Sequence, residues 1–217
     1  MNAIPEIIGR QSSHYTRLVR IFALELGVTC RFTPIFDLIS MDRSTYAGNP
    51  ALKLPILDHQ GEHIYGSHNI CRALLQISGN HQNIVWPEDS TTPLLMNAHE
   101  ILAHAMNAQV EVVIHEIVEE RPPDNASRKR RQSLVNCLMW LDKHLDQIID
   151  TLPERDLSIF EVSLFCLVSH LPFRNPMDLS TMPNLLSFEQ AFAKRSSAQA
   201  TPYRFDSPTT SDPDAQD

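Results

Sequence analysis

The sequence predicts a mixed α/β unit followed by an all-helical unit. Short β-like and helical patterns alternate up to about residue 78, and the β pattern stops after Ser78-Gly79-Asn80. The formal charge changes at the same point, because residues 1–78 carry seven basic and six acidic side chains while the remainder carries 11 and 20. Only 6 glycines against 15 prolines in 217 residues also favour long helices over folds rich in Gly-rich phosphate-binding turns.

The first unit contains short strands and two amphipathic helices. Leu18, Ile21 and Phe22 recur at helical spacing, and Gly27 follows them as a helix C′ residue. The four residues 58–61 join two strands into a hairpin. The predicted elements are a strand at 4–8, a helix at 17–26, strands at 28–38, 54–57 and 62–65, and a helix at 67–77.

The second unit is predicted to be entirely helical. Pro93 stands at a helix-start position, and the expected helices cover residues 92–120, 127–150, 158–170 and 185–194. We therefore expect domains at residues 1–80 and 92–204, joined by a linker at 81–91. Residues 205–217 are polar, acidic and proline-bearing, which predicts a disordered tail.

Composition excludes several classes of function. The net charge of −8 argues against a nucleic-acid binder, and neither G-x-G-x-x-G nor the P-loop motif occurs. The N-terminus lacks signal-peptide features and no apolar run is long enough to span a bilayer, so we expect a cytoplasmic protein without membrane partners. The four cysteines are widely spaced, which predicts reduced thiols. His99 and His104 are five residues apart on a helix and cannot chelate a metal together, so no metal site is expected.

Five segments occur in an order that is similar to that of one known family. They are residues 7–20, Asn49–Leu57, Gly66–Ile70, the capping-box sequence Ser158–Glu161 and the closing helix Pro183–Arg195. Over about 190 residues this order resembles the cytosolic glutathione transferase superfamily with a serine-type active site. The resemblance implies a thioredoxin-like α/β N-terminal domain with a mixed four-stranded sheet, then an all-α C-terminal helical bundle.

The chemistry implied by the resemblance is addition of the glutathione thiol to a hydrophobic electrophile. A thiol with a pKa of about 8.5 is mostly protonated at pH 7, so a hydroxyl donor at a helix N-terminus is needed to stabilise the thiolate. Ser13 stands where the loop enters the first helix and is the expected catalytic residue. Ser12 and Tyr15 are the alternatives, and both serines also suit a plain helix cap.

Two further segments are implied to bind glutathione, which acts as co-substrate, with no other cofactor expected. In the family the bond before Pro55 is cis, so that the Leu54 backbone pairs with the cysteinyl part, and Lys53 either binds the glycyl carboxylate or is a solvated surface lysine. Ser67 is expected to be the N-cap of the next helix and to bind the γ-glutamyl carboxylate. Gly66 departs from the family, which has Glu or Gln there for the γ-glutamyl amino group.

The resemblance also narrows the possible classes within the glutathione transferase superfamily. The chain lacks the serine-cysteine loop of the maleylacetoacetate isomerase class, and it has no cysteine at the Ser13 position for deglutathionylation. A homodimer and a role in detoxification are implied. The alternative is a non-catalytic binding or regulatory protein similar to the stringent starvation proteins, which Gly66 and His14 favour. Ser158 with Glu161 is assigned to folding, and the basic run at 128–131 is expected to pair with Glu116, Glu119 and Glu120.

Overall fold

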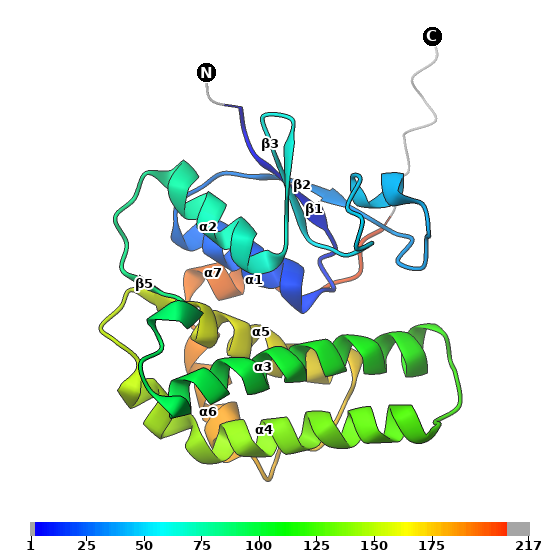
Figure 1. The fold of residues 1–217 in the computed structure, drawn as a ribbon, viewed down its shortest axis with the longest axis vertical. Coiled ribbons are helices and arrows are strands. Elements are labelled where there is room, and N and C mark those ends of the chain that lie inside the picture. The colour runs from blue at the N-terminus through cyan, green and yellow to red at the C-terminus, as the bar shows by residue number, and fades with distance from the viewer. Residues whose placement is uncertain (1–2, 208–217) are drawn as a thin grey trace.

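The computed structural model describes residues 3–207, in which a four-stranded sheet occupies the N-terminal part (Figure 1). The strand order is β2-β1-β3-β4. β1 (Glu6–Gly9) runs parallel to β2 (Arg31–Pro34) and antiparallel to β3 (Ile56–His59), and β3 pairs with antiparallel β4 (Glu62–Tyr65). The expected mixed sheet is therefore present.

Two helices cover the face of this sheet that is turned toward the helical part (Figure 1). They are α1 (His14–Glu25) and α2 (Ser67–Ser78), which pack against each other. The rest of the described chain is helical apart from short segments. Its elements are β5 (Ile84–Val85), the 3-10 helix η2 (Pro87–Asp89), α3 (Pro93–Val112), the π-helical turn η3 (Val113–Val118), α4 (Asn125–Thr151), β6 (Leu157–Ser158), α5 (Ile159–Arg174), α6 (Pro183–Phe192) and α7 (Ser196–Gln199). In the N-terminal part, a 3-10 helix, η1 (Arg43–Tyr46), follows β2.

The element boundaries differ from the sequence predictions in several places. β2 covers only Arg31–Pro34 of the strand expected at 28–38. The hairpin turn is only Gln60-Gly61, both with positive φ (58° and 82°), so β3 starts and ends two residues later than expected. The helix expected to end at Glu120 changes to a π-helical turn, η3, after Val112. α5 continues past Pro172, which lies in its last turn and removes only one backbone hydrogen bond. The pairing of β5 with β6 was not predicted, because strands of two residues carry no periodicity.

One apolar core joins the two parts, and α5 lies at its centre. Residues of α5 from Ile159 to Leu171 are almost all buried, and α1 packs directly against them. Arg17 is a buried charged residue in this interface. Its guanidinium carbon lies 4.5 Å from the Phe165 ring centroid and 4.4 Å from that of Tyr203, while its N–H groups donate to Ser169 Oγ and the Ala198 carbonyl. The charge is thus stabilised by two rings and two oxygens instead of a carboxylate.

The four cysteines are free thiols, as expected. Burial raises the pKa of Cys166 to about 12 and that of Cys30 to about 11, so both remain protonated at neutral pH. Within residues 3–207, no helix is long and apolar enough to cross a bilayer.

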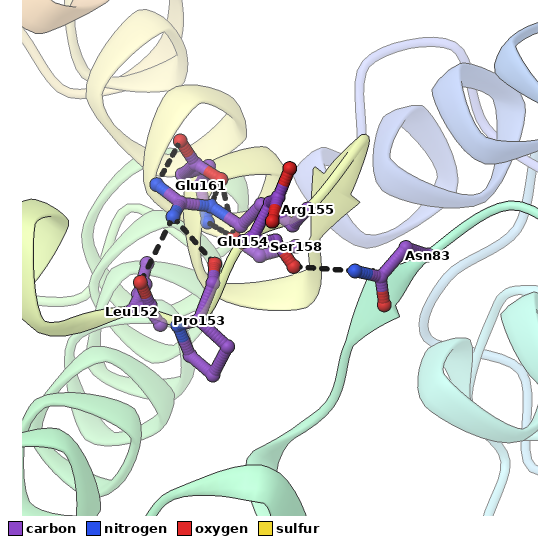
Figure 2. Close-up of polar contacts among 7 residues, drawn as sticks. All are labelled: Asn83, Leu152, Pro153, Glu154, Arg155, Ser158 and Glu161. Carbon is purple, nitrogen blue, oxygen red and sulfur yellow. Dashed lines mark hydrogen bonds and ion pairs between the residues drawn. The ribbon is translucent and has the colours of Figure 1, made fainter.

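The start of α5 is capped by Ser158, and the cap is completed differently from the expected capping box (Figure 2). Ser158 Oγ accepts a hydrogen bond from Glu161 N at 3.0 Å and donates to Glu161 Oε2 at 2.7 Å. The Glu161 carboxylate also binds the Arg155 guanidinium, with Nε–Oε2 and Nη2–Oε1 distances of 2.6 and 2.9 Å. Glu161 therefore holds the turn between α4 and α5 in addition to the helix start.

We expect Ser158→Ala to lower the free energy of unfolding by about 1 kcal/mol, because the backbone N–H of Glu161 loses its acceptor and Glu161 loses a donor. Urea titration followed by circular dichroism measures this change. Ser196→Ala is the matched control, since Ser196 is an exposed first residue of α7 with no capping contact, and it should change stability by less than about 0.5 kcal/mol. Equal effects of the two substitutions would contradict the assignment.

Candidate functional site

The register of the sheet brings the predicted site residues to one end of it. β1 ends at Gly9, and Ile8 pairs with Ile56 at the start of β3, which in turn pairs with Tyr65 at the end of β4. The loop that leads to α1, the segment before β3 and the start of α2 therefore lie at the same end of the sheet. Ser13, Leu54 and Ser67 all belong to these three segments.

The connection from β1 to α1 is tight. A Cβ atom on Gly9 would lie 2.6 Å from Thr16 Oγ1, so only glycine allows this approach. Arg10 N donates to the same hydroxyl at 3.3 Å. The end of β1 thus passes directly over the first turn of α1 and fixes where the intervening loop can lie.

Ser13 is the N-cap of α1. Its backbone is extended (φ −98°, ψ 130°), and its Oγ accepts a hydrogen bond from Thr16 N at 3.3 Å. Because a hydroxyl can accept and donate at once, this cap leaves the Ser13 proton free for another acceptor. The first turn of α1 contains no acidic residue, so its positive end is not neutralised from within the helix.

The two alternatives to Ser13 have different surroundings from it. Tyr15 donates its hydroxyl proton to Asn107 Oδ1 at 2.9 Å, and burial raises its pKa to about 12. Ser12 is buried, and its carbonyl accepts a hydrogen bond from His170 Nε2 at 3.0 Å. These contacts hold the loop and the first turn of α1 against the helical part.

The segment before β3 has the expected cis bond between Leu54 and Pro55. Asn49, which is 4% exposed, donates from Nδ2 to the Lys53 carbonyl at 2.8 Å and so fixes the preceding chain. Lys53 itself is exposed at the surface, while Leu54 is half-buried.

The start of α2 corrects one prediction. The N-cap is Gly66, with no side-chain cap, and Ser67 is the first helical residue rather than the cap. Gly66 has φ 86° and ψ 128°, a conformation that side-chain-bearing residues avoid. The first turn of α2 again lacks an acidic residue, so the Ser67 hydroxyl lies beside unpaired N–H groups at a positive helix end.

His68 is the second residue of α2 and is half-buried. Burial and the nearby Arg72 lower its pKa, so it is neutral at pH 7, and its other charged neighbour is Glu88, at the start of the helical part. His68 is also close enough to His99 of α3 to lower the pKa of that ring.

The C-terminal segment contacts the same loop, which sequence reasoning did not predict. Gln11 donates from its backbone N and from Nε2 to the two oxygens of Asp206, both at 2.9 Å. Arg204 Nε donates to Gln11 Oε1 at 2.6 Å. Beside these contacts is a cavity of about 360 Å³, lined by Gln11, Phe32, Pro34 and residues 204–207. Residues 208–217 of the expected tail lie outside the described residues.

The other charged motifs have local structural roles. His104 pairs with Glu100, and His99 packs edge-on against Phe160, while burial lowers the His99 pKa to about 4. From residue 3 to residue 207, no three His, Cys, Asp or Glu side chains gather as metal ligands. Arg131 pairs with Glu116 as expected, but Arg130 pairs with Glu111, and Glu119 pairs with Arg121.

Comparison with known proteins shows which family and fold the chain is similar to. Residues 7–82 match the family model described as Glutathione S-transferase, N-terminal domain. A glutathione transferase family member from Pseudomonas fluorescens Pf-5, solved with bound glutathione, is 21% identical with a TM-score of 0.74, covering 92% of this chain and 99% of that one. A glutathione S-transferase from Methylobacterium radiotolerans in complex with glutathione sulfonate is 19% identical, with a TM-score of 0.71 and coverage of 94% and 97%. Poplar glutathione transferase F1 is 16% identical, with a TM-score of 0.65 and coverage of 92% and 96%.

No curated protein sequence matches the chain. The fold is nevertheless that of the cytosolic glutathione transferases over nearly the whole chain. The family-model match over residues 7–82 agrees with this fold. The expected superfamily and fold class are therefore confirmed.

The burial of His170 makes a prediction about pH. Burial lowers its pKa to about 4, and the ring is 4% exposed, whereas an unfolded histidine titrates near 6.5. Because the unfolded state binds the extra proton, the free energy of unfolding should fall as pH drops from about 6.5 toward 4. The contribution of one such histidine is on the order of 2 kcal/mol at pH 5.

Urea titrations at pH 7 and pH 5 test this dependence. His170→Gln, which cannot titrate, should show a smaller loss of stability between the two pH values than the wild type. The exposed His81 is the control, and His81→Gln should leave the loss unchanged. An unaltered loss in the His170 variant would refute the buried neutral state.

Proposed function

We propose that this protein is a glutathione transferase in which Ser13 stabilises the thiolate of bound glutathione for attack on a hydrophobic electrophile. The observation that carries the proposal is the Ser13 hydroxyl at the unneutralised N-terminus of α1, with a proton free to donate. The thiol proton leaves to solvent, and the sulfur anion accepts the hydrogen bond from Ser13 Oγ. The helix terminus adds a partial positive charge at the same place.

Ser13 is favoured over its two alternatives by their contacts. The Tyr15 proton is already donated to Asn107, and burial raises the Tyr15 pKa, which disfavours its anion. Ser12 is only 8% exposed, and its carbonyl accepts a hydrogen bond from His170. Only Ser13 is both half-buried and at the helix cap.

Glutathione binds across this end of the sheet, where the three segments meet. Leu54 pairs through its backbone with the cysteinyl part, next to the cis Pro55, and Lys53 is exposed where it can meet the glycyl carboxylate. Ser67 and the N–H groups of the first turn of α2 receive the γ-glutamyl carboxylate. Two of the solved relatives contain glutathione or glutathione sulfonate, which supports this class of ligand.

The electrophile lies against aromatic side chains at the end of α5. Phe173 stacks on Tyr203 with ring centroids 5.4 Å apart and packs against Phe205 at 5.0 Å. The same C-terminal segment reaches Gln11, two residues before Ser13. A flat apolar molecule suits such a surface, and detoxification of such compounds is the corresponding physiological role.

The protein forms a homodimer in the cytoplasm. Exposed apolar side chains support the dimer, because they occur both after β2 and on the long helices α3 and α4, the two regions that a partner would bring together. They are Phe36, Ile39 and Met41 in the first region and Met96 and Met139 in the second. The free thiols support a reducing compartment. Residues 1–80 form the glutathione-binding domain, with the linker at 81–91 and the helical domain at 92–204.

The competing function is a non-catalytic binding or regulatory protein with the same fold. Gly66 favours it, because no side chain at this position accepts a hydrogen bond from the γ-glutamyl amino group. Weak glutathione binding by the wild type, without turnover, would support this alternative.

We expect Ser13→Ala to lower kcat for conjugation of glutathione to a generic aryl halide about 100-fold, because the thiolate loses its hydrogen-bond donor. Ser13→Asp separates this role from capping, since Asp caps helices as well as Ser but its anion cannot donate a proton. It should keep the wild-type stability and still lack activity. Ser12→Ala and Tyr15→Phe serve as controls that retain most activity. A fully active Ser13→Asp enzyme would exclude the proposed role.

We expect Gly66→Gln to increase affinity for glutathione about tenfold, the scale of one hydrogen bond to a charged group. There is room for the new side chain, because its Cβ would lie 3.8 Å from Asn69 Nδ2. The positive φ should lower the free energy of unfolding by about 1 to 3 kcal/mol. Gly66→Ala has the same backbone strain without an acceptor, so calorimetry should show no gain in affinity for it. Equal affinity of the two variants would contradict the missing-acceptor interpretation.

A further inference from the structure

A buried chain of hydrogen-bonded side chains runs from the loop before α1 into the helical part. It starts at the Ser12 carbonyl and ends at the ion pair between Arg131 and Glu116. Its three middle members, His170, Gln109 and Asn175, are 4%, 0% and 3% exposed. The donor-acceptor distances are 3.0 Å for His170 Nε2 to Ser12 O, 3.0 Å for Gln109 Nε2 to His170 Nδ1, 2.9 Å for Asn175 Nδ2 to Gln109 Oε1 and 3.2 Å for Arg131 Nη1 to Asn175 Oδ1.

Chemistry fixes the direction of every link. The Ser12 carbonyl can only accept a hydrogen bond, so His170 must carry its proton on Nε2 and accept on Nδ1. Gln109 must then donate to this nitrogen, which leaves its oxygen for Asn175. At the far end Arg131 can only donate, which agrees with the oxygen of Asn175 facing it. One tautomer of His170 and one orientation of each amide satisfy the whole chain.

The Ser12 carbonyl belongs to the peptide group whose nitrogen is that of Ser13. His170 holds the oxygen of this peptide, and Ser13 N donates to the Arg10 carbonyl at 3.1 Å on the other side. A planar peptide fixed at both its oxygen and its nitrogen cannot rotate. This peptide fixes the positions of the Ser13 N and Cα atoms, and the Ser13 carbonyl on the other side accepts a hydrogen bond from Arg17 N at 2.9 Å. The two constraints together set the φ of Ser13, and with it the direction in which its Cα–Cβ bond points.

We infer that His170 is a positioning residue for Ser13, acting through the Ser12 carbonyl to aim the Ser13 hydroxyl at the glutathione sulfur. The inference rests on the proposed function for the catalytic role of Ser13. His170 does not touch the substrates in this role. Gln109, Asn175 and Arg131 act behind it by holding the ring in the tautomer that donates to Ser12.

The test compares His170→Leu, which removes the donor, with His170→Gln, whose side-chain amide places an N–H group at a similar reach. The readouts are the pKa of the bound glutathione thiol, from its thiolate absorbance, and kcat and KM with a generic aryl halide. We expect His170→Leu to raise the thiol pKa by about one unit and to lower kcat about tenfold, with KM for glutathione changed less than about twofold. We expect His170→Gln to restore both values.

The matched control is His99→Leu. His99 is a half-buried histidine between the two parts, whereas His170 is buried, and His99 packs on Phe160 without a hydrogen bond to the loop. This variant should leave the thiol pKa unchanged. If His170→Leu does not fold, Gln109→Met keeps the ring while removing the donor to its Nδ1, and it should shift the thiol pKa in the same direction.

Three results would overturn the inference: an unchanged thiol pKa and kcat in His170→Leu, failure of His170→Gln to restore them, or an equal shift in His99→Leu. If the wild type neither binds nor turns over glutathione, the proposed function fails, and hydrogen exchange of residues 10–16 then decides the positioning role. Faster exchange there in His170→Leu but not in His170→Gln supports it. Unchanged exchange in both refutes it.

Discussion

The structure of the site depends on one constraint: the buried backbone groups between β1 and α1 must find hydrogen-bond partners. These partners come from parts of the chain more than 150 residues away, as His170 binds the Ser12 carbonyl and Asp206 binds the Gln11 backbone N–H. An unpaired buried carbonyl or amide costs about 1 to 3 kcal/mol, which is a large share of the stability of a typical domain. The loop that presents Ser13 therefore takes its shape only when the helical part is packed against it.

Helix termini supply the electrostatic character of this site. The first turns of α1 and α2 both lack acidic residues. The register of β1, β3 and β4 brings the N-termini of these two helices to the same end of the sheet. An extended anionic peptide such as glutathione suits two positive helix ends at one edge, without a cluster of basic side chains. The net charge of −8 is therefore compatible with the proposed glutathione site.

The interface between the two parts holds polar groups with little net charge. Burial keeps His14 and His170 neutral, and His170 donates to the Ser12 carbonyl while it accepts from Gln109. Arg17 is the one buried cation of α1, and the rings of Phe165 and Tyr203 and two oxygen acceptors stabilise it. Hydrogen bonds and cation–ring contacts require specific distances and angles, so these groups fix how α1 packs on α5. Apolar contacts alone would fix this packing less strictly.

The sequence by itself determined the α/β-then-helical division and the order of the main helices and strands, because local periodicity, capping and the order of motifs are written in neighbouring residues. The candidate site residues at 13, 54–55 and 67 remain a prediction. The sequence also marked Gly66 as an exception. Only the tertiary structure decided that Gly66 and not Ser67 caps α2, that Arg155 completes the Ser158 cap, and that His170, Asn107 and Asp206 hold the loop before α1 and the first turn of that helix. These contacts join residues that are far apart in the chain, and no local pattern records which distant side chain will meet a given carbonyl.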